Sequence, residues 1–150
     1  MALKYQHNID ELGISKVCPP KDLSKIDLVA FRWVYDPINH HLNFLPNYEF
    51  DKAKGNVERY TNGEYDDVRK CARCSQSFFI TLDAAKINHR KLSKMFKDLL
   101  GYTHVASGNL SNIDGEATKA STTGHFSFYE DSNSDLVSKF GICDQLDSWT

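Results

Sequence analysis

The stretch TLDAAKINHRKLSKMFKDLLG, residues 81–101, carries the clearest helical pattern in the chain. Thr81 is a residue type that caps helix N-termini, Asp83 suits the positive end of a helix, and Gly101 suits a helix C-terminus. Between these signals, apolar side chains recur at helical spacing; they are Ala85, Leu92, Phe96 and Leu99. We therefore expect one long helix over residues 82–100, with one apolar face packed against the rest of the protein.

The same stretch carries a second stripe, of basic residues, roughly opposite the apolar one at ~100° per residue. Its members are Lys86, Arg90, Lys94 and Lys97. A basic stripe can meet phosphates or an acidic partner, although it can also be an ordinary solvated helix face. Nucleic-acid readers usually add a strongly basic domain, whereas this chain has a net charge of −2. The stripe therefore favours a protein partner with an acidic surface over a nucleic acid.

Segments on both sides of this stretch predict an antiparallel sheet, because they are rich in β-branched and aromatic residues. Strand patterns occupy residues 27–35, 75–80, 102–110, 124–130 and 141–146. In the first of them, DLVAFRWVY, the face that carries Phe31 and Trp33 is expected to meet the core. In GHFSFYE (124–130), Phe126 and Phe128 are expected to lie on the face opposite Ser127.

The remaining segments predict short or irregular structure. A short helix is expected over residues 8–12 with its end at Gly13, a helical turn over 66–74, an edge strand or loop over 43–50, and a polar surface excursion over 51–65. The 43–50 expectation rests on Pro46, which interrupts a strand.

These elements predict a single α+β domain over residues 1–150, mainly an antiparallel sheet of four to five strands with the long helix on one face. No apolar run approaches the length of a membrane span. No apolar signal segment follows the first residues, so the expected location is the cytoplasm. The four cysteines are then expected to be thiols, because the cytoplasm is reducing.

Charge is unevenly distributed along the chain. Residues 51–100 hold eleven Lys or Arg and seven Asp or Glu, whereas residues 101–150 hold two and seven. A basic middle and an acidic end can lie in contact, or they can present two faces of opposite sign.

The motif Cys71-Ala-Arg-Cys74 raises three alternatives. Half of a zinc site is one, which Cys18 and Cys143 could complete only if the fold gathers them. A redox pair is another, although such pairs usually precede a helix and a strand is expected here. The favoured alternative has one buried and one half-exposed thiol in a packed region, with no metal or cofactor.

Two histidines on expected strands, His104 and His125, suggest an enzymatic site as an alternative. If their strands pair, both could share a face with Ser127 and Tyr129 and perform acid–base work on a phosphoester or nucleotide. No phosphate-binding loop, dinucleotide fingerprint, nucleophile elbow or zinc-protease motif occurs in the chain. The balance therefore favours a binding module, with a small hydrolase or transferase as the alternative.

The succession of NFLP (43–46), SFF (77–79), HVASGNL (104–110) and GHFSFYE (124–130) resembles a group of small uncharacterised bacterial proteins. The likeness spans residues 12–146 and implies a shared fold and no particular activity. Members of that group have a single cysteine near position 71, which implies that Cys74 is not part of a family metal site. With the composition and the stripe, the resemblance suggests an accessory module within a larger bacterial assembly.

Overall fold

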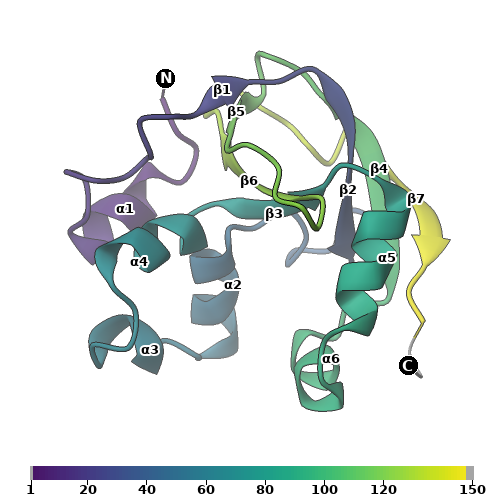
Figure 1. Cartoon of the computed structure of the whole chain (residues 1–150), viewed down its shortest axis with the longest axis horizontal. Coiled ribbons are helices and arrows are strands. Elements are labelled where there is room, and N and C mark those ends of the chain that lie inside the picture. The colour runs from purple at the N-terminus through teal and green to yellow at the C-terminus, as the bar shows by residue number, and fades with distance from the viewer. Residues whose placement is uncertain (1, 148–150) are drawn as a thin grey trace.

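One antiparallel sheet runs through the computed structural model, which describes residues 2–147 (Figure 1). Over these residues seven strands follow the order β1-β5-β6-β3-β2-β4-β7. They are β1 (Ser24–Lys25), β2 (Leu28–Val34), β3 (Gln76–Phe79), β4 (His104–Leu110), β5 (Gly115–Ala117), β6 (His125–Glu130) and β7 (Phe140–Gln145). The expected α+β class is confirmed, and the sheet has more strands than the four or five expected.

The principal core lies on the β2 face that carries Ala30 and Val34, both fully buried. Its members are Ala30, Val34, Phe44, Phe78, Ala106, Leu110, Ala117, Phe126, Phe128, Leu136 and Phe140. The opposite face, with Phe31 and Trp33, is half-buried and packs in a smaller cluster. The aromatic face was therefore the wrong choice for the main core, because small residues on β2 let the phenylalanines of β3 and β6 pack closely.

Two helices replace the one long helix expected over residues 82–100. They are α5 (Leu82–Arg90) and α6 (Lys94–Leu100). Thr81 and Gly101 do mark the outer ends, since the Thr81 hydroxyl accepts from the Ala84 amide and Gly101 is left-handed. The break comes from Ser93, whose hydroxyl accepts a hydrogen bond from the Phe96 amide at 3.2 Å and caps a second helix.

α5 covers the aromatic face of the sheet (Figure 1). Trp33 fixes it there, because its indole Nε1 donates to the carbonyl of Ala85 at 2.8 Å. The Trp33 ring also meets the buried His89 edge-on, with 5.3 Å between ring centroids. α6 continues beyond the sheet, so part of its surface is free of contact with the strands.

Four short helices form the opposite side of the molecule. They are α1 (Gln6–Leu12), α2 (Asn47–Lys54), α3 (Glu58–Thr61) and α4 (Asp67–Arg73). Gly13 ends α1, and a helix does lie within residues 66–74, as expected. The edge strand expected over 43–50 is not formed: residues 43–46 are turn and loop, and Pro46 sits just before α2, where a missing N–H costs nothing. The surface excursion expected over 51–65 is mostly exposed, but it contains the end of α2 and all of α3.

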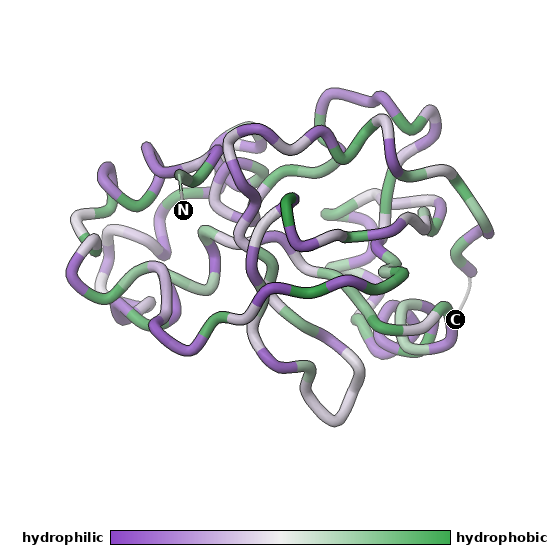
Figure 2. Tube along the Cα trace, turned by 90° about the horizontal axis from the view of Figure 1, so that it is seen from above, coloured by the Kyte–Doolittle hydropathy of each residue, from purple (hydrophilic) through white to green (hydrophobic). Residues whose placement is uncertain are grey.

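Hydrophobic and hydrophilic stretches alternate over short distances along the trace (Figure 2). None of the helices within residues 2–147 has the length and apolarity that a membrane crossing requires.

Candidate functional site

The cysteines behave differently from the thiols expected. Cys18 and Cys71 form a disulfide across 53 residues of sequence. Cys74 is a free thiol that is buried rather than half-exposed, and Cys143 is free and exposed. The reason is tertiary: the connector after α1 packs on α4, in a cluster that includes Ile9, Ile14, Cys18, Cys71, Cys74 and Tyr129.

This cluster is not arranged for metal or thiol chemistry. Cys71 is already bonded, and no group of His, Cys, Asp or Glu within residues 2–147 is placed to hold a metal ion. Burial raises the pKa of Cys74 to about 12, so this group stays a thiol at neutral pH. The Tyr129 hydroxyl donates to the carbonyl of Cys71 at 3.0 Å, which ties β6 to α4.

The basic stripe is largely neutralised within the chain. Lys86 pairs with Asp144, Arg90 with Asp147 and Lys94 with Asp98, each with a nitrogen–oxygen distance of 2.9 Å. Lys97 is buried, at 9 % exposure. Two of these partners belong to the acidic end of the chain, so the basic middle and the acidic end lie in contact here.

The two histidines are not brought together. His104 lies on β4 and His125 on β6, and β3 and β2 separate these strands in the sheet. Three strand spacings place the two backbones roughly 14 Å apart across the sheet. Ser127 does share a face with His125, but Tyr129 is buried against the disulfide cluster. The two-histidine hypothesis required these strands to pair, and they do not, so one substrate atom cannot reach both imidazoles.

A fork between two central strands creates a cavity instead. β2 pairs with β4 along its whole length but pairs with β3 only at Phe31 and Phe79. Beyond that pair, toward the end of β2 and the start of β3, the two strands diverge. A cavity of about 170 Å³ lies in this fork, where α2 and the end of α6 also line it. Its polar lining consists of Arg32, Asn47, Asp51, Arg73, Ser77 and Tyr102. Trp33, Phe50, Phe79 and Leu100 supply the apolar lining.

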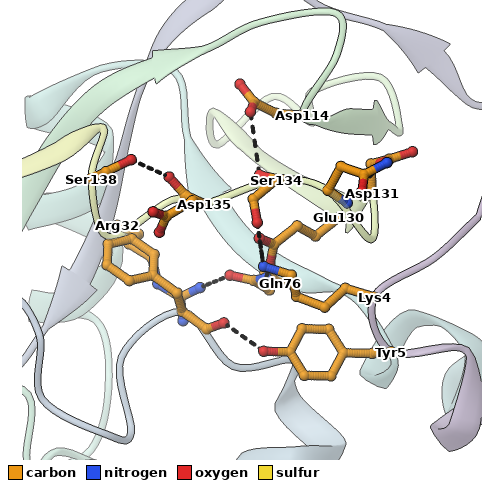
Figure 3. A network of polar contacts seen from close by, with 12 residues as sticks. Lys4, Tyr5, Arg32, Gln76, Asp114, Glu130, Asp131, Ser134, Asp135 and Ser138 are labelled. Atoms are coloured by element: carbon orange, nitrogen blue, oxygen red, sulfur yellow. Dashed lines mark hydrogen bonds and ion pairs between the residues drawn. The ribbon is translucent and has the colours of Figure 1, made fainter.

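Arg32 is the unusual member of this lining, because it is a cation at 4 % exposure. Its Nη1 donates to the Gln76 amide oxygen at 2.8 Å, and its guanidinium lies 5.2 Å from the centre of the Phe78 ring. Figure 3 shows Gln76 standing between Arg32 and Glu130. Within residues 2–147, Arg32 makes no ion pair with a carboxylate of its own.

Glu130 is shared with another cation. Gln76 donates to one carboxylate oxygen of Glu130 at 2.7 Å, and the Lys4 ammonium pairs with the other at 2.9 Å (Figure 3). Burial raises the pKa of Glu130, although Lys4 and Gln76 act against that rise. The row from Arg32 to Lys4 thus holds two cations and one carboxylate.

Arg73 and Asp51 stand at the mouth of the cavity. The Arg73 Nη2 lies 2.6 Å from an Asp51 carboxylate oxygen, to which the Tyr60 hydroxyl also donates. The Arg73 Nε donates to the Tyr60 hydroxyl at 2.9 Å. This triad connects α2, α3 and α4, so the position of each group is fixed by the other two.

Outside this mouth lies a larger groove of about 460 Å³, which shares Asp51, Arg73 and Leu100 with the inner cavity. We call it the outer groove. One wall comes from α3, α4 and the loop between them, with Arg59, Tyr60, Tyr65, Arg69 and Arg73. The other wall is apolar and comes from α6 and the residues before it, with Leu92, Phe96, Leu99 and Leu100.

The basic wall is built around Tyr65. The Arg69 guanidinium lies 4.8 Å from the centre of the Tyr65 ring, and the Arg73 guanidinium lies 5.9 Å from it. Arg59 pairs with Glu64 at 3.1 Å. Arg69 has no ion-pair partner among the described residues, so its charge is free to meet a ligand.

The sequence hypotheses missed both the outer groove and the inner cavity. The groove-forming residues are divided among three expected segments: the polar excursion over 51–65, the helical turn over 66–74 and the helix over 82–100. Arg32 lies in the expected strand over 27–35, where no role was expected for it. A usable signal was present, since two tyrosines and three arginines lie within residues 59–73 and aromatic–basic mixtures favour binding surfaces.

Comparison with known proteins adds no family: no family model matches the chain, and neither a curated protein nor a solved structure matches it.

Proposed function

We propose that this protein is a binding module whose outer groove takes an acidic segment of a partner protein that also carries apolar side chains. The observation that carries this proposal is the contrast between the two walls. Arg69 lies over Tyr65 with no carboxylate partner among the described residues, and it faces a groove whose other wall holds Phe96 and Leu99. Those two side chains are 39 % and 48 % exposed.

Charge and size both support this kind of ligand. The groove lining holds three arginines against Asp51 and Glu58, which leaves one positive charge in excess. A volume of about 460 Å³ falls in the range of specific ligand sites. Arginine and tyrosine are also the residue types that most often carry binding energy in protein interfaces.

The proposed role is still that of an accessory module within a larger bacterial assembly, but its contact surface is the outer groove rather than the basic stripe. The basic stripe presents less free positive charge to a partner, because Lys86, Arg90 and Lys94 are already paired with carboxylates of the same chain. Binding an acidic partner there would require these pairs to be broken, whereas Arg69 needs no such exchange.

The test uses two synthetic amphipathic peptides of equal length. One carries Glu, Leu and Phe, and its twin carries Lys at every Glu position. Fluorescence anisotropy should show binding of the acidic peptide, and R69E should weaken it about tenfold because a guanidinium that meets a carboxylate becomes a repelling charge.

K94E is the matched control, because it makes the same charge change at an exposed residue outside the groove lining. It should leave the affinity within about twofold of the unmodified protein. Equal affinity for both peptides, or an equal loss of affinity in R69E and K94E, would contradict binding in the outer groove.

The disulfide bears on where such binding takes place. Disulfides persist in oxidising compartments and are rare in the cytosol. Cys18–Cys71 therefore supports an oxidising compartment over the expected cytoplasm. Alkylation of the denatured, unreduced protein from its host should label two cysteines, Cys74 and Cys143; labelling of all four would return the protein to a reducing location.

A further inference from the structure

We infer that the inner cavity at the β2–β3 fork is a binding site for a small carboxylate, with Arg32 as its cationic anchor. This site is distinct from the outer groove and does not depend on a peptide ligand. Three features carry the inference: an excess of buried positive charge, unused hydrogen-bond donors, and a volume that fits a small acid.

The charge argument begins with the cost of burying a guanidinium. Taking a cation out of water is unfavourable unless a carboxylate or strong acceptors replace the solvent. The close neighbours of Arg32 are neutral: the Gln76 amide, the Tyr102 side chain and two aromatic rings. Glu130 lies beyond Gln76 and is shared with Lys4.

The cavity lining points to a ligand with one negative charge. It holds Arg32, Arg73 and Asp51, and Asp51 is matched by Arg73, so one positive charge remains. A carboxylate makes the lining neutral, whereas a doubly charged phosphate would leave an excess negative charge in a buried place. A monoanion is therefore the better electrostatic match.

Donors for its oxygens are present in the lining. Arg32 uses Nη1 on Gln76, Nε, at 3.4 Å, on the carbonyl of Trp33, and one further N–H on the Tyr102 side chain, so two of its five N–H donors are left for an anion. Ser77 and Asn47 also line the cavity, and their side chains supply a hydroxyl and an amide as neutral donors. An arginine fork with two further donors is a common arrangement for carboxylate recognition.

The size of the cavity and its apolar walls indicate the nature of the part of the ligand beyond its carboxylate. A cavity of about 170 Å³ is comparable to an engineered protein cavity that holds benzene. Trp33, Phe50 and Phe79 give it an apolar side. The ligand is therefore an acid with a short hydrocarbon portion. Its carboxylate can belong to a free small molecule or to the C-terminus of a peptide that lies in the outer groove.

The first experiment titrates butyrate into the isotope-labelled protein at constant ionic strength. Saturable shifts are expected in the backbone amide signals of residues 32, 47, 77 and 102, with a Kd of about 1 mM or tighter. Inorganic phosphate at the same ionic strength should not displace butyrate. Absence of saturable binding, or displacement by phosphate, overturns the inference.

Variants of two asparagines provide the matched comparison. N47A removes a donor from the inner cavity, and N56A removes the same side chain from the outer groove, which Asn56 lines. N47A should weaken butyrate about fivefold and N56A should not, because one lost hydrogen bond costs about 1 kcal/mol. R32K, which keeps the charge and loses the planar fork, should weaken it further. Equal affinity in all three variants contradicts the site.

A second experiment uses the acidic peptide to distinguish a free small acid from a peptide C-terminus as the ligand. This experiment rests on the proposed function. If an amidated C-terminus weakens that peptide about tenfold, the cavity takes the peptide terminus. If amidation has no effect while butyrate binds, the ligand is a free acid. Butyrate binding without any peptide binding supports the cavity and removes only the outer groove.

Discussion

Buried charges in this protein are satisfied by short chains of neighbouring side chains. Asp114 is one example: its carboxylate is 3 % exposed, accepts from the Ser111 amide and hydroxyl, and pairs with the Lys139 ammonium. Ser134 donates to its other oxygen at 3.2 Å (Figure 3). Arg32 and Lys97 are exceptions: Arg32 reaches a carboxylate only through Gln76, and the buried Lys97 ammonium has no hydrogen-bond partner among the described residues.

Asp114 predicts how stability depends on pH. Burial raises its pKa, but hydrogen bonds from Lys139 and Ser111 outweigh burial and hold the pKa below its ordinary value of 3.8. A depressed pKa gives stability that is present above 3.8 and lost as the pH falls further. D114N should therefore lower the free energy of unfolding by about 1–3 kcal/mol at pH 7, with a smaller difference at pH 3.

Urea unfolding at both pH values measures this effect. D98N is the control, because the Asp98 side chain is 67 % exposed and its pair with Lys94 is a surface pair. A D114N deficit that is the same at pH 7 and pH 3 would contradict the role of the ionised carboxylate.

These individual roles have no signal in the local sequence pattern. Alternation correctly placed Phe126 and Phe128 opposite Ser127, because the period of a strand is fixed by its backbone. Whether Arg32 meets a carboxylate or an amide depends on β3 and β6, which are far away in sequence. Local pattern contains no information on such a pair.

At the scale of elements, helix ends were predictable and a helix break was not. Thr81 and Gly101 act through local backbone geometry, as expected. Ser93 has the same capping chemistry, but it lies inside a continuous apolar pattern that argued for one helix. The break matters for the outer groove, because it sets α6 at its own angle and leaves Phe96 and Leu99 exposed.

Lys97 provides a test of packing between these helices. Its side chain is buried, and its Nζ has no hydrogen-bond partner among the described residues. K97M keeps the length of the side chain and removes a buried charge, so it should raise the free energy of unfolding by about 1 kcal/mol.

The comparison for K97M is K94M, at a residue whose side chain is 86 % exposed. K94M should change the free energy of unfolding by about 0.5 kcal/mol or less, since exposed ion pairs contribute little. If K97M is the less stable of the two variants in thermal and urea unfolding, Lys97 has a partner that stabilises it.

At the scale of the whole molecule, several long-range ties hold the N-terminal part against the rest. They include the Cys18–Cys71 disulfide, the Lys4–Glu130 ion pair and the hydrogen bond from Lys52 to Asn8. The succession of strand and helix patterns along the chain was enough to predict an α+β fold with an antiparallel sheet. Strand order, the disulfide, the inner cavity and the outer groove could not be predicted, because each depends on contacts between distant segments.

The disulfide should contribute strongly to stability. It closes a loop of 53 residues, and the loss of unfolded-state entropy for such a loop corresponds to about 4 kcal/mol. C18A/C71A should therefore lose a large part of the free energy of unfolding. C143S is the control, because Cys143 is exposed and free. A loss in C18A/C71A no greater than in C143S would mean that the crosslink is not a structural staple.

The central claim is that binding occurs in the outer groove rather than on the basic stripe. Its most direct test is amide chemical-shift mapping with the acidic amphipathic peptide. Binding in the outer groove should move the signals from α3, α4 and α6 around Tyr65, Arg69 and Phe96, while those near Lys86 and Arg90 stay in place. Shifts centred on Lys86 and Arg90, with the groove signals unchanged, would contradict it.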